Sequence, residues 1–129
     1  AETGHLVFGT LHTTGAAKTV DRIVDVFPAG EKEMVRSMLS ESLRAVISQT
    51  LLKTKDGSGR VAAHEIMLST PAVRNLIREN KIAQIGSVMQ TGQQYGMQTL
   101  DQCLQNLVRR NQISLDVARS KASNPDLIN

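Results

Sequence analysis

The stretch TLLKTKDGSGRVAAHEIML, residues 50–68, decides the local fold of the middle of this chain. Two runs rich in strand-forming residues, Thr50–Lys55 and Arg60–Leu68, flank the sequence Asp56-Gly57-Ser58-Gly59. Aspartate and glycine are favoured in tight turns, because they tolerate backbone conformations that other residues avoid. The pattern therefore predicts a β-hairpin with a four-residue turn.

Two helices are predicted before the hairpin. Between Ala16 and Phe27 apolar residues recur every three or four positions, and Pro28 ends the pattern. A second helix is predicted from about Glu31, with one apolar stripe that continues to residue 47. The members of this stripe are Val35, Leu39, Leu43, Val46 and Ile47.

A short apolar run, His5–Leu11, precedes the first helix, and His12 follows it directly. Such a run, bounded by glycine and threonine, is typical of a strand buried on both faces. A strand of this kind needs neighbours on both sides, and we find no parallel partner for it in the chain. Together with Ala1 in the first position, the lone strand indicates a piece of a longer protein. We expect the unpaired strand to self-associate or to be partly disordered.

Short helices are predicted after the hairpin. Thr70 and Pro71 provide an N-cap and a first-turn proline for a helix over residues 72–80. Further helices are expected over residues 82–90, over residues 100–108 and after a Ser114 cap, with fraying beyond Ser123. We therefore predict an α/β fold with two regions. Residues 1–69 hold the strand, two helices and the hairpin, and residues 70–129 hold a cluster of short helices.

The composition argues against several classes of protein. The chain has 129 residues, a net charge of +3 and a pI near 9.4, and only 2% of its residues are aromatic. Few aromatic faces argue against a carbohydrate cleft or a base-stacking surface. One cysteine excludes an intrachain disulfide framework and a multi-cysteine zinc site. Because no membrane span and no signal peptide is found, we expect a soluble, cytoplasmic protein.

The segment His12–Thr19 lies at a predicted strand-to-helix junction and ends in Lys-Thr, which is the context of a phosphate-binding loop. That motif requires glycine immediately before the lysine and again five residues earlier. Here Ala17 and His12 occupy these positions. A Cβ at Ala17 would obstruct close approach of the backbone to phosphate, so we reject a Walker A loop.

The three histidines are expected to play different roles. On the predicted strand His5 and His12 would lie on opposite faces, about 23 Å apart, so they cannot share a metal ion. Ligands of open α/β sheets lie at the carboxyl ends of strands, where His12 falls. His12 is therefore the candidate for sensing phosphate or handling a proton, with a role in capping the loop as the alternative. We expect His5 to bond to a neighbouring segment and His64 to be a hydrogen-bonded interior residue.

The helix predicted over residues 72–80 has two different faces. Val73, Leu76 and Ile77 form an apolar stripe, whereas Arg74 and Arg78 share another face. The simpler interpretation of the two arginines is a solvated basic surface. The alternative is a docking site for an acidic partner.

Three motifs in the chain resemble those of the PilT-type retraction ATPases of type IV pili, within the secretion ATPase superfamily. Residues 3–14, TGHLVFGTLHTT, look like the His box of the superfamily. Residues 72–79, AVRNLIRE, resemble the more specific AIRNLIRE signature, with Val73 in place of isoleucine. Residues 96–101, GMQTLD, are also similar to that family. The motifs occur in the order of the family and together cover nearly the whole chain.

The resemblance implies that the chain is the C-terminal part of a RecA-like P-loop ATPase domain and its following helices. ATP and Mg²⁺ are implied as cofactors of the parent protein, with neither expected to bind this chain tightly. In the family the Walker A loop, the Asp box and the Walker B carboxylate precede the His box, so we expect the chain alone to be inactive. By position His5 and His12 are the implied catalytic histidines. The implied coupling and docking residues are Arg74, Asn75, Arg78 and Glu79, and no metal site is implied.

The implied parent protein is a homohexamer that binds an inner-membrane pilus platform protein. It would be cytoplasmic, peripheral to the inner membrane at the pilus base, and would bind no nucleic acid. One alternative is a pilus-extension or type II secretion ATPase, which the AVRNLIRE signature and the lack of a four-cysteine metal element disfavour. Another is a basic helical nucleic-acid-binding module that uses residues 100–122 as a helix–turn–helix, which the scattered charge disfavours.

Overall fold

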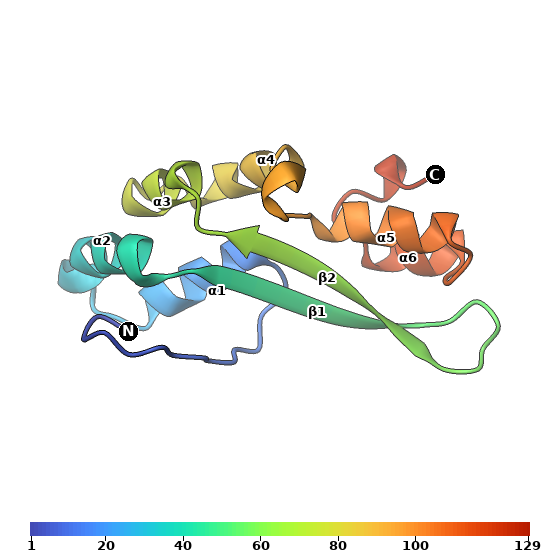
Figure 1. The fold of residues 1–129 in the computed structure, drawn as a ribbon, viewed down its shortest axis with the longest axis horizontal. Coiled ribbons are helices and arrows are strands. Elements are labelled where there is room, and N and C mark those ends of the chain that lie inside the picture. The colour runs from blue at the N-terminus through green and yellow to red at the C-terminus, as the bar shows by residue number, and fades with distance from the viewer.

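The computed structural model describes all 129 residues, which form six α-helices, four short 3-10 helices and one two-stranded antiparallel sheet. In chain order the main elements are α1 (Ala16–Asp25), α2 (Lys32–Ser42), β1 (Ala45–Lys53), β2 (Arg60–Leu68), α3 (Pro71–Arg78), α4 (Ile85–Gln90), α5 (Leu100–Arg109) and α6 (Leu115–Lys121). The 3-10 helices are Ala29–Glu31, Ile82–Gln84, Gln93–Tyr95 and Pro125–Leu127. Helices α1 to α4 gather at one end of the hairpin, and α5 and α6 lie along its other half (Figure 1).

The predicted hairpin is confirmed, but its bounds differ from the prediction. The connecting loop comprises residues 54–59 rather than 56–59, and the first strand begins at Ala45 rather than at Thr50. The two strands pair antiparallel from Ala45 opposite Leu68 to Lys53 opposite Arg60, which leaves residues 54–59 as the connecting loop. Asp56 organises this loop, because its carboxylate accepts hydrogen bonds from the Ser58 backbone N–H at 2.9 Å, the Thr54 hydroxyl at 2.7 Å and the Ser58 hydroxyl at 2.8 Å. Led by the Ser58 backbone bond, these donors stabilise the charged carboxylate and lower the pKa of Asp56 to about 2.

Strand β1 includes two residues that the periodicity assigned to the second helix, so the predicted length of that helix is wrong. Helix α2 ends at Ser42, and Leu43 already has an extended backbone with φ −69° and ψ 130°. Val46 lies opposite Met67 and is buried, whereas Ile47 faces the other side and is 65% exposed. Helical and alternating patterns are hard to separate over so few residues. Pairing with β2 decides between them.

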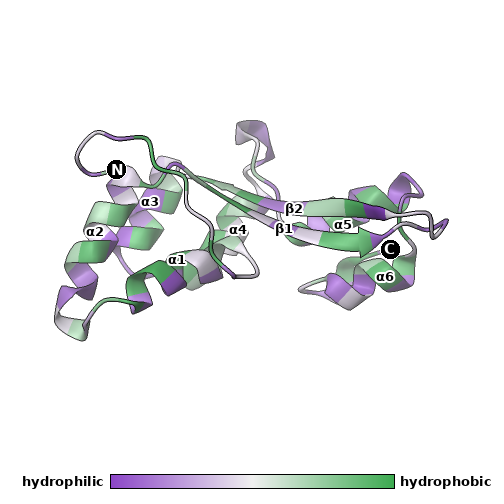
Figure 2. Ribbon diagram, turned by 90° about the horizontal axis from the view of Figure 1, so that it is seen from below, coloured by the Kyte–Doolittle hydropathy of each residue, from purple (hydrophilic) through white to green (hydrophobic).

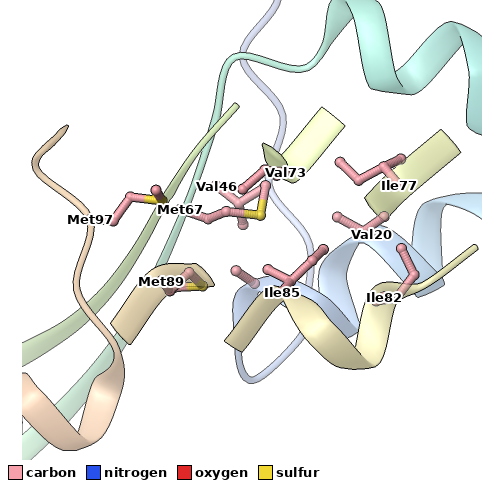
Figure 3. Packing of buried hydrophobic residues seen from close by; sticks show 10 residues of the cluster. Val20, Val46, Met67, Val73, Ile77, Ile82, Ile85, Met89 and Met97 are labelled. Atoms are coloured by element: carbon pink, nitrogen blue, oxygen red, sulfur yellow. The ribbon is translucent and has the colours of Figure 1, made fainter. Parts of the chain in front are cut away.

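Two apolar clusters hold the helices against the hairpin. The first lies at the hairpin base between α1, α3 and α4 (Figure 3). Its ten buried residues are Ala16, Val20, Val46, Met67, Val73, Ile77, Ile82, Ile85, Met89 and Met97. The second lies under α5 and α6 and comprises Leu52, Ala63, Leu104, Leu107, Ile113, Ala118 and Ile128. Both clusters combine residues from before and after position 70, and the division of the chain at that position stays a prediction.

The strand predicted over residues 5–12 is wrong. Residues 5–13 have no regular secondary structure, and the side chains of Leu6, Val7 and Phe8 are 80%, 61% and 89% exposed. Figure 2 shows the hydrophobic stretch of this segment outside the helices. A strand requires a partner for its backbone hydrogen bonds. Outside the hairpin the sole bridge is between Ile66 and Gln98, so this apolar run pairs with no other part of the chain.

The short helices predicted after the hairpin are confirmed. The side chains of Thr70, Thr99 and Ser114 cap the first turns of α3, α5 and α6, respectively. Each accepts a hydrogen bond from a backbone N–H that would otherwise lack a partner within the helix. No helix of the chain is both long enough and apolar enough to cross a membrane.

The predicted fraying beyond Ser123 is wrong. The Asp101 carboxylate accepts hydrogen bonds from the backbone N–H groups of Ser123 at 2.8 Å and Asn124 at 2.9 Å. The Arg119 guanidinium donates to the Ile128 carbonyl at 3.1 Å, and the Ile128 side chain is fully buried. These contacts join residues 9 to 23 positions apart, beyond the range of a local helix or turn pattern, so no such pattern predicts them.

Candidate functional site

The loop before α1 is held by hydrogen bonds to the first turn of that helix. The hydroxyl of Thr19 donates to the Gly15 carbonyl at 2.8 Å and lies 2.7 Å from the hydroxyl of Thr13. Because the Thr19 hydrogen is used on Gly15, the Thr13 hydroxyl is the donor of the second bond. Gly15 has φ +100° and ψ 153°, a conformation that favours glycine. These contacts place His12, which directly precedes Thr13, beside α1.

His12 lies in an open pocket of about 320 Å³ between the loop and the outer face of α1. All the lining residues are polar, and they are His12, Thr13, Thr14, Lys18, Asp21, Arg22 and Asp25. Histidine takes up and releases protons near neutral pH, and hydroxyl and cationic groups donate hydrogen bonds to anions. The pocket therefore combines a histidine and several hydrogen-bond donors with the carboxylates of Asp21 and Asp25, so its two cationic side chains are balanced by two acidic ones.

His5 does not line this pocket. Its Nδ1 lies 3.1 Å from the Thr3 hydroxyl, within the same exposed segment. The prediction that His5 bonds to a neighbouring segment is therefore wrong, because its hydrogen bond is to a residue two positions away. The argument that placed His5 and His12 on opposite faces of a strand does not apply, because no strand forms. The structure brings His12 to α1 and leaves His5 outside the pocket.

Glu65 is a residue near this loop that the sequence reasoning missed. It lies on the inward-facing register of β2, between the fully buried side chains of Ala63 and Met67. Its Oε2 accepts a hydrogen bond from the backbone N–H of Ala16, the first residue of α1, at 2.7 Å. A glutamate at an inward position of an alternating strand was the available signal, since such positions normally hold apolar residues.

The N-terminus of α1 is not suited to bind the phosphates of a nucleoside triphosphate. A helix N-terminus binds anions through its free N–H groups and the positive end of its dipole. In this structure the carboxylate of Glu65 already accepts the Ala16 N–H and would repel a phosphate. This arrangement agrees with the rejection of a Walker A loop at Lys18. The groups able to donate a hydrogen bond to a phosphate are those of His12, the two threonines, Lys18 and Arg22 in the His12 pocket, which approach from the side of the helix.

The apolar stripe predicted on α3 is confirmed, because Val73 and Ile77 are fully buried and Leu76 packs against the first cluster. Arg74 is half-buried, and its Nε is buried with no hydrogen-bond partner. The basic face is therefore solvated only in part.

The other three candidate docking residues lie on the exposed side of α3 and at its end. Exposed Arg78 donates to the side-chain oxygen of Asn75 at 3.0 Å. Glu79 pairs with Lys81 at 3.2 Å. None of the α3 candidates lines the His12 pocket.

His64 and Cys103 have structural contacts. The Nε2 of His64 lies 3.0 Å from the side-chain oxygen of Gln49, its cross-strand neighbour. His64 is half-buried, so it is hydrogen-bonded as expected but less interior. The Sγ of Cys103 accepts the His64 backbone N–H at 3.4 Å, and its side chain packs against the second cluster. The structure has no group of three or more His, Cys, Asp or Glu residues that could hold a metal ion.

Comparisons with known proteins identify relatives of nearly the whole chain. The model of the family described as type II/IV secretion system protein matches residues 1–56. A twitching motility protein of Neisseria gonorrhoeae is 77% identical over 126 residues, which are 98% of this chain and 34% of that protein. The type IV pilus retraction ATPase PilT of Pseudomonas aeruginosa is 71% identical over 126 residues, which are 98% of this chain and 36% of that protein.

A solved structure matches the fold over the same extent. The crystal structure of the pilus retraction motor PilT with bound ADP has a TM-score of 0.87 and 48% sequence identity to this chain. The match covers 98% of this chain and 35% of that chain. This chain therefore spans about a third of the length of the relatives that it matches.

Proposed function

Because this chain belongs to the family of type II/IV secretion system proteins, and to its PilT-type twitching motility branch, we propose that it is part of a motor that hydrolyses ATP to retract type IV pili. The observation that carries this proposal is the identity of 71% to 77% with two such proteins over 98% of the chain. The likeness to a retraction motor with bound ADP supports it. Since the chain spans about a third of those proteins, the activity is that of the full-length protein.

We further propose that the first part of the chain belongs to a RecA-like ATPase domain, with the remaining helices packed on it. The full-length protein would act as a homohexamer at the cytoplasmic side of the inner membrane, at the pilus base, where it meets a pilus platform protein. The phosphate cradle and the magnesium ligands would come from parts of the protein other than these 129 residues. The chain alone is therefore expected to hydrolyse no ATP.

The proposed chemical role within the chain is that of His12. Bound ATP with Mg²⁺ would supply the phosphoryl group whose hydrolysis drives the motor. In the pocket beside α1 the imidazole of His12 is accessible to solvent, where it can donate a hydrogen bond or hold a proton. His5, the second histidine of the motif, is proposed to assist from outside the pocket.

The proposed mechanical role is that of α3. Arg78 with Asn75, and Glu79 beyond them, face solvent, and Arg74 carries a buried Nε without a partner. Arginines four residues apart on a helix repel weakly and contribute no stability of their own. Their presence is better explained by an acidic surface on a neighbouring subunit or on the pilus machinery.

A side-by-side assay of two full-length variants tests this separation of roles. His12→Ala should lower ATP hydrolysis by about 10²- to 10⁴-fold, the range for a lost acid–base or positioning group. The double variant Arg74→Ala/Arg78→Ala should keep most of the hydrolysis and impair twitching motility, because the helix provides no phosphate-binding loop and its arginines do not line the His12 pocket. A second double variant, Arg109→Ala/Arg110→Ala, removes the same charge from two exposed residues at the end of α5 and should keep both activities. If the α3 variant loses hydrolysis as completely as His12→Ala, docking and chemistry are not separate.

A further inference from the structure

Helix α1 is capped differently from the other well-capped helices of the chain. Thr70, Thr99 and Ser114 cap α3, α5 and α6 from within their own segments. The N-cap of α1 is a glycine, which has no side chain to accept a hydrogen bond, and its first turn holds no acidic residue. The first N–H of α1 is satisfied by Glu65, which lies 49 residues further along the chain.

The carboxylate of Glu65 lies between the first residues of two helices. Its Oε2 accepts the Ala16 N–H of α1 at 2.7 Å, and its Oε1 lies 3.4 Å from the Leu100 N–H of α5, a long and weaker contact. Both helix dipoles direct their positive ends toward it, and hydrogen bonds to a charged acceptor are stronger than neutral ones. The start of α1 is therefore tied to β2, and more weakly to α5.

Gly15 makes the short contact to Glu65 possible. A Cβ on Gly15 would lie 3.0 Å from the Oε2 of Glu65, and the φ of +100° would strain any other residue. The glycine thus admits a carboxylate at the position that a capping side chain fills elsewhere.

A series of hydrogen bonds connects the start of α1 to the residue that follows His12. From Ala16 the connection passes through Gly15 and Thr19 to Thr13, by the hydrogen bonds of 2.8 Å and 2.7 Å, and His12 is the next residue. Residues 5–12 have no regular secondary structure, and they are exposed. The residue that follows His12 is therefore tied to the start of α1, which Glu65 holds against β2.

We propose that Glu65 is a positioning residue for His12. By holding the first turn of α1 against β2, it keeps the His12 imidazole at the orientation that hydrolysis needs, and it links that orientation to the start of α5. This inference rests on the role of His12 in the proposed function. Glu65 itself touches neither substrate nor cofactor in this role.

A double-mutant cycle in the full-length protein tests the inference. Glu65→Gln keeps the shape of the side chain and removes its charge. It should lower kcat for ATP hydrolysis by roughly tenfold, as small displacements of a catalytic group do, with KM changed by less than about twofold. In the His12→Ala background Glu65→Gln should have no further effect, because its action passes through His12. An equal reduction in both backgrounds would show a general structural role and overturn the inference, as would unchanged kcat in Glu65→Gln.

Hydrogen–deuterium exchange provides a readout independent of hydrolysis. Amides of residues 13–20 should exchange faster in Glu65→Gln and in Gly15→Ala, which places a methyl group against the carboxylate. The control Glu41→Ala removes an exposed glutamate of α2 and should leave exchange and kcat unchanged. If the full-length Glu65→Gln protein does not assemble, Gly15→Ala replaces it, and its effect on kcat is measured with and without His12→Ala in the same way. If the His12→Ala variant hydrolyses ATP normally while the amides of residues 13–20 exchange faster in Glu65→Gln, the proposed role of His12 is wrong. The contact between Glu65 and Ala16 would then be purely structural.

Discussion

Replacement of Ile128 by alanine tests whether the end of the chain is folded. The side chain is fully buried in the second cluster although it lies one residue from the end of the chain. Each buried methylene group contributes about 0.8 kcal/mol, and a residual cavity adds to the loss. Ile128→Ala should therefore lower the free energy of unfolding by about 3 kcal/mol. The unfolding entropy of a chain of 129 residues converts this loss into a decrease of Tm of about 10 °C.

The neighbouring residue supplies the matched control. The side chain of Leu127 is 56% exposed, so Leu127→Ala should change the free energy of unfolding by less than about 0.5 kcal/mol. Thermal unfolding followed by circular dichroism, together with urea titration of both variants, measures the difference. The reasoning is refuted if Ile128→Ala is as mild as Leu127→Ala, since the chain beyond Ser123 would then be frayed in solution.

Further predictions concern glycine packing, one carboxylate, the N-terminal segment and nucleotide binding. Gly92→Ala should destabilise the chain by about 1 to 3 kcal/mol, because its Cβ would lie 3.1 Å from the Val88 carbonyl oxygen and 3.2 Å from the Cβ of buried Met97. Gly86→Ala in α4 meets no atom within 4 Å and should stabilise the chain slightly. The folded-state pKa of Asp56, about 2, is below its ordinary value of 3.8, so the stability that its hydrogen bonds contribute is present above pH 3.8 and is lost as the pH falls through about 2. An NMR titration midpoint of Asp56 near 3.8 would contradict the hydrogen bonds seen in the loop. The exposed apolar side chains of residues 6–8 should cause self-association that Phe8→Ser reduces, and a concentration-independent monomer in light scattering would refute this. Calorimetry of the chain with ATP and Mg²⁺ should show no tight binding, and micromolar affinity would refute the assignment of the phosphate cradle to other parts of the protein.

The candidate site was predictable only in part. The motif around His12 and its position before a helix are readable from the sequence, and the structure places His12 in a polar pocket beside α1. Its catalytic role, like the docking role of Arg74 and Arg78, stays a prediction. Glu65 was missed because its contact with Ala16 joins segments 49 residues apart, and local patterns carry no information on such pairs.

The sequence by itself determined the elements that depend on short-range interactions. The loop around Asp56, the start of α3 at Thr70 and the cap of α6 at Ser114 are each set by contacts between residues two or three apart. Motifs of the same local kind predicted the family, which the comparisons confirm. Such signals are present in the chain before any tertiary contact forms.

Only the tertiary structure decided the features that need a distant partner. Val46 is in a strand because Met67 lies opposite it, and residues 5–12 form no strand because nothing in the chain pairs with them. Ile128 is buried because it packs in the second cluster. Helix α1 begins where the carboxylate of Glu65 accepts a hydrogen bond from the first backbone N–H of the helix. In each case the free energy comes from surface buried or hydrogen bonds made between segments that are remote in sequence, so composition and periodicity alone could not determine the outcome.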